Sequence, residues 1–115
     1  MTRLSEIINL DPSIRFVACM DKSGDILSSE TRKDVVGHEM LPMSYLEVGA
    51  TMFRTAWSCA NSFSKYFGDS FGVVFHHDKL DLILMEINNK IYAITVEKNV
   101  ESHKIMRIVT ELLNK

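Results

Sequence analysis

Residues 80–97 read LDLILMEINNKIYAITVE, two apolar runs separated by a pair of asparagines. Asparagine tolerates the left-handed backbone that a tight hairpin turn requires, so Leu80–Ile87 and Lys90–Glu97 are predicted to be antiparallel strands. Both runs carry apolar residues at odd and at even positions, and a strand that is apolar on both faces is covered on both faces. Helices are therefore expected on both sides of this sheet.

Three further strands are expected around this hairpin. Residues 71–76 (FGVVFH) precede it, and Ile14–Met20 (IRFVACM) is another run with apolar residues on both faces. The sequence DKSGD follows that run, and Gly24 within it can adopt a positive φ in a tight turn. Residues 25–29 then return as a second, more polar strand. Short links within each group of strands favour an antiparallel sheet.

Apolar residues at helical spacing predict three helices. The first covers residues 3–10, and the proline at position 12 ends it because the residue before proline avoids the helical region. The second is long and covers residues 45–67. The third begins at about Asn99, which is a good N-cap residue, and carries a broad apolar stripe. Residues 30–42 lack periodicity and are expected to form a long connecting loop.

The long helix has the clearest start and stop signals in the chain. Ser44 and Glu47 have the spacing of a capping box, and Gly68 is a natural C-terminal stop. One stripe of the helix is expected to face the sheet, and it comprises Leu46, Gly49, Phe53, Ala56, Trp57, Ala60, Phe63 and Phe67. Gly49 inside this helix suggests the close approach of another element. Gly72 inside a strand suggests either a bulge or a close backbone approach.

The elements follow one another as α-β-β-α-β-β-β-α. This order predicts a three-layer α/β/α sandwich of the α+β type, with a mainly antiparallel five-stranded sheet between the helical layers. The chain has 115 residues, which fits one domain of ordinary size. We therefore expect a single domain over residues 1–115.

Composition excludes several classes of function. Thirteen basic and fifteen acidic residues give a net charge of −2, which offers no driving force for binding nucleic acid. No apolar run reaches the roughly 18 residues of a membrane span, and the start MTRLSEIINLDPS lacks the apolar stretch of a signal peptide. Cys19 and Cys59 cannot build a disulfide framework, and both fall in buried-looking elements. A reduced, cytoplasmic setting is expected.

No set of residues with recognisable chemistry stands out. Neither GxxxxGK[ST] nor GxGxxG occurs, so a phosphate-binding loop is not expected. His76 and His77 are neighbours in a strand and would point to opposite faces, and His38 and His103 add no ligand spacing. We expect no metal, no cofactor and no catalytic residues, and a small enzyme is the least favoured function.

The first hairpin carries a family resemblance. Residues 16–28, FVACMDKSGDILS, look like the opening "apolar strand, Asp-x-x-Gly, apolar strand" of the roadblock family of dynein light chains and their prokaryotic relatives. The order of elements is similar to that family over nearly the whole chain. The resemblance implies a homodimer in which the third strand joins its twin across a two-fold axis and the long helices pack beside each other. It also implies that the dimer acts on small Ras-like GTPases or takes part in scaffolding complexes.

A strand and a helix face are expected to form the dimer interface. The segment FGVVFH has no charge and no proline, so it is poorly protected as a free sheet edge. The interface residues expected are Gly72, Val73, Val74 and Phe75 on the strand, and Thr51, Arg54, Thr55 and Ser58 on the helix. Three methionines, Met40, Met43 and Met52, could add an exposed contact surface.

Two functions from different classes remain open at this point. The first is a non-catalytic, dimeric protein-interaction module that regulates or scaffolds a small Ras-like GTPase. The alternative is a PAS-like sensor domain that holds a small ligand in a pocket between the sheet and the long helix. A pocket lined by aromatic side chains would favour the sensor, whereas an apolar edge strand buried in a two-fold interface would favour the module.

We predict that the purified protein neither hydrolyses nucleotide nor binds metal stoichiometrically. Nucleotide hydrolysis needs a phosphate cradle and magnesium ligands, and a structural metal site needs about four converging ligands. Elemental analysis of protein purified without chelator or affinity tag tests the second half, and turnover against a no-protein blank tests the first. One equivalent of zinc or iron per chain, or turnover that persists through purification, would contradict the prediction.

Overall fold

The computed structural model describes residues 4–36, 44–70, 72–98 and 100–114, without the side chains of residues 44–47 and 50. The capping box of Ser44 and Glu47 therefore lies outside the described side chains. The elements are α1 (Leu4–Ile8), β1 (Ile14–Met20), β2 (Ile26–Thr31), the 3₁₀ helix η1 (Lys33–Val35), α2 (Ser44–Asn61), α3 (Ser64–Phe67), β3 (Val73–His76), β4 (Leu80–Ile87), β5 (Lys90–Glu97) and α4 (Ser102–Leu113).

The strands form one antiparallel sheet in the order β2-β1-β5-β4-β3. The two central pairings are β5 with β1 and β5 with β4, and both extend over most of each strand. The strands expected to be apolar on both faces, β1, β4 and β5, occupy the middle of the sheet. The two more exposed strands, β2 and β3, form its edges.

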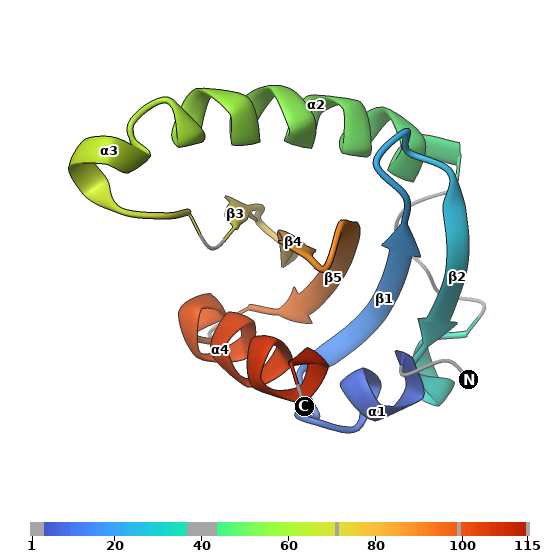
Figure 1. Cartoon of the computed structure of the whole chain (residues 1–115). Helices are drawn as coiled ribbons and strands as arrows, with labels where there is room; N and C mark the ends of the chain where they lie inside the picture. Colours follow the sequence, from blue (N-terminus) through green and yellow to red (C-terminus); the bar gives the residue numbers. More distant parts are fainter. Residues whose placement is uncertain (1–3, 37–43, 71, 99, 115) are drawn as a thin grey trace.

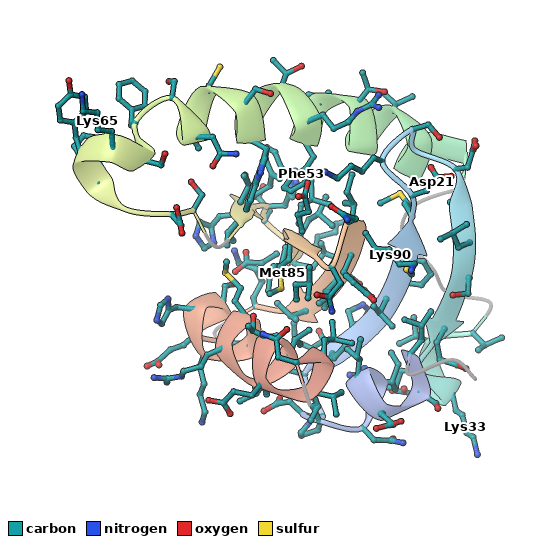
Figure 2. All side chains as sticks on the ribbon, in the orientation of Figure 1. Asp21, Lys33, Phe53, Lys65, Met85 and Lys90 are labelled. Atoms are coloured by element: carbon teal, nitrogen blue, oxygen red, sulfur yellow. The ribbon has the colours of Figure 1, made fainter. Side chains whose placement is uncertain are left out.

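Helices cover both faces of the sheet, as Figure 1 shows. The long helix α2 crosses one face, and α1 and α4 lie on the other. Figure 2 shows Phe53 reaching from α2 towards the sheet and Met85 lying between the sheet and α4. Each of these two side chains is almost completely buried, and each belongs to a separate apolar cluster. The predicted three-layer α+β sandwich with a five-stranded sheet is confirmed.

The turns follow the expected backbone chemistry. Asn88 and Asn89 have φ values of 53° and 65°, which is the left-handed conformation of a two-residue hairpin. Gly24 in the first hairpin has φ 97°. Gly68, at φ 86°, follows the last residue of α3 and donates its N–H to the Ser64 carbonyl oxygen, so it ends the helix as predicted.

The prediction of one continuous helix over residues 45–67 was wrong for its last six residues, because α2 ends at Asn61 and a separate short helix follows. The Ser62 hydroxyl donates to the Cys59 carbonyl oxygen at 2.6 Å, and the Phe63 N–H donates to the Ala60 carbonyl oxygen at 3.1 Å. These bonds compete with the regular helical pattern and tighten the last turn. The chain restarts as the short helix α3 in a new direction.

This break exposes residues that the helical stripe placed against the sheet. Phe63 and Phe67 were expected to be internal but are 51% and 81% exposed. Cys59 was also expected to be buried and is exposed, whereas Cys19 is buried as expected. The prediction held for Phe53, which lies over the sheet rather than beyond it.

Other boundaries shift by a few residues. The first helix is shorter than the predicted residues 3–10. The second strand extends to Thr31, so the predicted loop of residues 30–42 begins within a strand and includes η1. The last helix begins at Ser102 rather than at Asn99, which itself lies outside the described residues. The third strand begins at Val73.

The two unusual glycines differ in what surrounds them. A Cβ atom on Gly72 would lie 2.5 Å from the Leu84 carbonyl oxygen and 2.9 Å from the Met106 Cε atom, so the predicted close approach is confirmed. A Cβ atom on Gly49 would meet nothing within 4 Å. The close approach expected at Gly49 is therefore not made by any described part of this chain.

These surroundings predict opposite effects of alanine. Gly72→Ala should lower the free energy of unfolding by about 1–3 kcal/mol, because the backbone of β4 cannot move away freely. Gly49→Ala should raise it by up to about 1 kcal/mol, because alanine is the better helix former and has room. Urea denaturation of dilute protein measures both. A Gly72→Ala protein as stable as the parent would show that this contact is not tight.

Candidate interaction surface

The β3 strand presents a bare edge of regular backbone. The His77 N–H donates to the Leu80 carbonyl oxygen at 3.0 Å, which fixes the hydrogen-bonding phase of the β3–β4 ladder. Alternate residues of an antiparallel strand point their N–H groups to opposite sides. The N–H groups of Val74 and His76 therefore point away from β4, to a side where none of the described strands pairs.

The opposite edge of the sheet is protected. In the β1–β2 ladder, Cys19 pairs with Ser28 but Met20 pairs with Ile26, so Leu27 is an extra, bulged residue. A bulge on an edge strand twists the edge and discourages another strand from adding to it. The β3–β4 ladder has no such shift along its length. Of the two edges, β3 is the one suited to pairing.

The predicted strand residues all lie at this bare edge. Val73 and Phe75 pack against the apolar cluster beneath α2, and Val74 packs against the cluster on the α4 side. Each of the three is half-buried, as is the adjoining Gly72. The strand is therefore anchored through both faces while its outer backbone remains accessible.

The predicted helix residues are exposed, but they do not form one group. Thr51, Thr55 and Ser58 are exposed on α2. The Arg54 guanidinium instead donates to the Lys22 carbonyl oxygen in the turn between β1 and β2. Arg54 thus ties α2 to the protected side of the sheet and lies away from the β3 residues with which it was grouped.

The structure exposes further apolar residues on α2 and α3. On α2, Val48 is 56% exposed and Met52, already suggested as a contact residue, is 60% exposed. In and beside α3, Phe63, Tyr66 and Phe67 are exposed, and Figure 1 shows α3 extending past the β3 edge. The sequence signal for this surface was the Asn61-Ser62 pair, which favours a helix end.

A buried carboxylate contacts the last residue of β3 and stabilises this end of the strand. Asp81 on β4 is 3% exposed, and its Oδ2 atom lies 3.0 Å from Nδ1 of His76. Lys98 Nζ donates to Oδ1 at 2.9 Å, and the Ser102 hydroxyl donates to Oδ2 at 3.2 Å. Burial alone would raise the pKa of Asp81, but the bonds from Lys98 and His76 outweigh it and hold the pKa below its ordinary value.

This cluster has a structural rather than a catalytic arrangement. In a catalytic triad the serine hydroxyl donates to a histidine, which in turn contacts the acid. Here the Ser102 hydroxyl donates directly to the Asp81 carboxylate, so a triad is not formed. The contacts join the end of β3, the start of β4, the segment after β5 and the first turn of α4. Asp81 therefore holds the edge strand and α4 in a fixed relation.

Among the described residues, no group of three or more His, Cys, Asp or Glu side chains could hold a metal ion. None of the helices within the described ranges has the length and apolar character to cross a membrane. A cavity of about 210 Å³ lies on α4, lined by His103, Met106, Arg107, Thr110 and Glu111.

The whole arrangement matches solved structures. A Roadblock/LC7 domain from Streptomyces avermitilis superposes with a TM-score of 0.65 at 14% sequence identity, over 96% of this chain and 91% of that chain. The chain has the roadblock fold. The gliding protein MglB from Thermus thermophilus superposes with a TM-score of 0.64 at 15% identity, over 89% of this chain and 73% of that chain.

A third solved structure gives the same result. Myxococcus xanthus MglB superposes with a TM-score of 0.55 at 13% identity, over 97% of this chain and 89% of that chain. No protein-family model and no curated protein matches the sequence. The roadblock fold predicted from the first hairpin and the element order is confirmed by these superpositions. Because the sequence identities are low, the superpositions show the fold alone.

The Asp81 cluster predicts a pH dependence of stability. The pKa of Asp81 is lowered by folding, so its contribution is fully present above the unfolded value of about 3.9 and is lost as the pH falls through the folded value. Asp81→Asn should therefore flatten the decline in unfolding free energy on acidification below about pH 5. Urea denaturation at a series of pH values measures this decline.

The matched control is Asp78→Asn, which removes an exposed carboxylate from the turn between β3 and β4. Its acid decline should follow that of the parent protein. If Asp81→Asn and Asp78→Asn show the same decline as the parent, the buried contacts do not contribute to stability in the way described.

Proposed function

We propose that this protein is a non-catalytic interaction module that acts as a homodimer and regulates or scaffolds a small Ras-like GTPase. The observation that carries the proposal is the bare, regular, uncharged edge of β3 beside a bulged edge at β2. An edge without protection is a hazard unless another strand covers it. A sheet that protects only one of its two edges is suited to pairing at the other.

Two-fold symmetry makes a second copy the suitable partner for that edge. Two antiparallel β3 strands related by a two-fold axis bring the outward N–H and C=O groups of each into register with those of the other. The strand is short, with four residues, so its ladder alone provides few hydrogen bonds. The exposed apolar residues of α2 and α3 supply the additional surface that a stable pair needs.

The choice of a GTPase rests on the family resemblance together with the fold. The resemblance implies a dimer that acts on small Ras-like GTPases or in scaffolding complexes, and this chain shares the roadblock fold over nearly its whole length. The proposal predicts binding of such a GTPase from the same organism, with different affinity for the GDP-bound and GTP-bound forms. Calorimetric titration against both forms tests it. If neither form binds, the GTPase part of the proposal is wrong.

The sensor alternative gains no support from the described cavity. A PAS-like pocket would lie between the sheet and α2. The cavity lined by Met106 and Thr110 belongs to α4, which covers the opposite face of the sheet. No specific observation therefore favours a second function.

We predict that Val74→Pro weakens dimerisation by at least about tenfold, which corresponds to about 1.4 kcal/mol. Proline removes the outward N–H of residue 74 but leaves the β3–β4 ladder intact, because that N–H points away from β4. Val74→Ala is the matched control, since it removes the same packing but keeps the N–H. Sedimentation equilibrium gives the dissociation constants. Equal dimerisation of the two variants would contradict pairing through β3.

A further inference from the structure

Aromatic side chains in and beside the α3 helix are exposed to solvent. The helix has four residues, and none of them is buried. Tyr66 is 76% exposed and Phe67 is 81% exposed, while Phe63 just before the helix is 51% exposed. The rings of Phe63 and Phe67 stack with their centroids 5.6 Å apart. These three aromatic residues are called the α3 aromatic group below.

We infer that the α3 aromatic group is an anchor that packs on a second copy of this chain, over the α2 side of its sheet next to β3. This inference rests on the proposed dimer and names the residues that would hold it together. It goes further than pairing of the edge strands, because it assigns about half of the contact area of each chain to a segment that lies outside both β3 and α2.

Position is the first argument for this occupant. Figure 1 shows that α2 carries α3 past the β3 edge, on the same side of the sheet as α2. A second copy paired through β3 continues the sheet into the space beyond that edge. The anchor of each copy would then lie over the sheet of the other, and the two-fold axis makes both contacts equivalent.

A suitable surface for the anchor is present on the same chain, as two-fold symmetry requires. On the α2 side of the sheet near β3, Val73, Phe75 and Leu82 are apolar and only half-buried, although α2 lies on this face. Trp57 on α2 is also half-buried, with its ring 5.4 Å from that of Phe53. Aromatic residues packed on such partly covered apolar positions are typical of the centre of an interface.

The available area is the second argument. An aromatic side chain buries about 150–250 Å² when it is fully covered, so the α3 aromatic group supplies on the order of 400 Å² per chain. A standard stable interface needs about 800 Å² per partner. The β3 edge can provide part of the rest through its outward backbone and its half-buried side chains. Without the anchor, the four-residue strand falls well short of this area.

The double variant Tyr66→Ser and Phe67→Ser tests the anchor. Both side chains are largely exposed, so the folded chain should keep its circular-dichroism spectrum and urea midpoint at dilute concentration. We expect its dimer dissociation constant to rise by at least about 100-fold, since two aromatic contacts are lost from each of two equivalent sites. The control is Leu27→Ser, which removes an apolar residue with 53% exposure from the opposite edge strand.

Two readouts report on the same event. Sedimentation equilibrium gives the dissociation constants directly. The chain has a single tryptophan, Trp57, which is half-buried near the proposed contact, so dissociation on dilution should shift its emission to longer wavelength. The midpoint of that shift should move in the double variant and stay in place in Leu27→Ser.

The outcomes separate the anchor from the dimer. If the double variant dimerises as the parent does while Val74→Pro does not, the anchor is wrong and the dimer stands. If the parent itself is monomeric at micromolar concentration, both the proposed function and the anchor fail. Binding of the monomeric parent, but not of the double variant, to vesicles of phosphatidylcholine and phosphatidylserine would assign the aromatic residues to a lipid surface instead.

Discussion

The outward backbone groups of β3 are the constraint on which the account depends. The N–H groups of Val74 and His76 point away from the sheet, and such groups must bond to water or to another chain. At the other edge, the bulge at Leu27 interrupts the regular array and reduces the same exposure. The molecule therefore has one edge that is protected against pairing by a bulge and one edge that has no such protection.

Several separate contacts hold this edge in place before any partner arrives. Gly72 allows the chain to pass close to the β4 backbone, since a side chain there would collide with the Leu84 carbonyl oxygen. Asp81 binds His76 at the far end of the strand and links it to Lys98 and Ser102. A strand fixed at both ends loses little freedom when it binds, which favours association.

The sheet could be predicted from sequence because its signals are local. The asparagine pair at 88–89 and Gly24 determine their turns through backbone conformation alone, and the apolar runs fix the buried strands. The steric need for Gly72 was also visible. The Asp81 cluster was not, because folding brings His76, Lys98 and Ser102 together from separate parts of the chain.

The exposed end of the long helix could not be predicted for a related reason. Helical spacing continues through Phe63 and Phe67, so the pattern alone places both on the buried face. Their burial depends on whether the sheet reaches beneath them, and the sheet ends at β3. A stripe that continues past the edge of its own sheet is typical of a surface that is covered in an assembly.

The solution mass of the unmodified chain tests the central claim most directly. Sedimentation equilibrium at micromolar concentration should give twice the chain mass of 13.1 kDa, with dissociation only on strong dilution. A mass of 13.1 kDa at every concentration would contradict the account, because the β3 edge would then be stable in water without a twin.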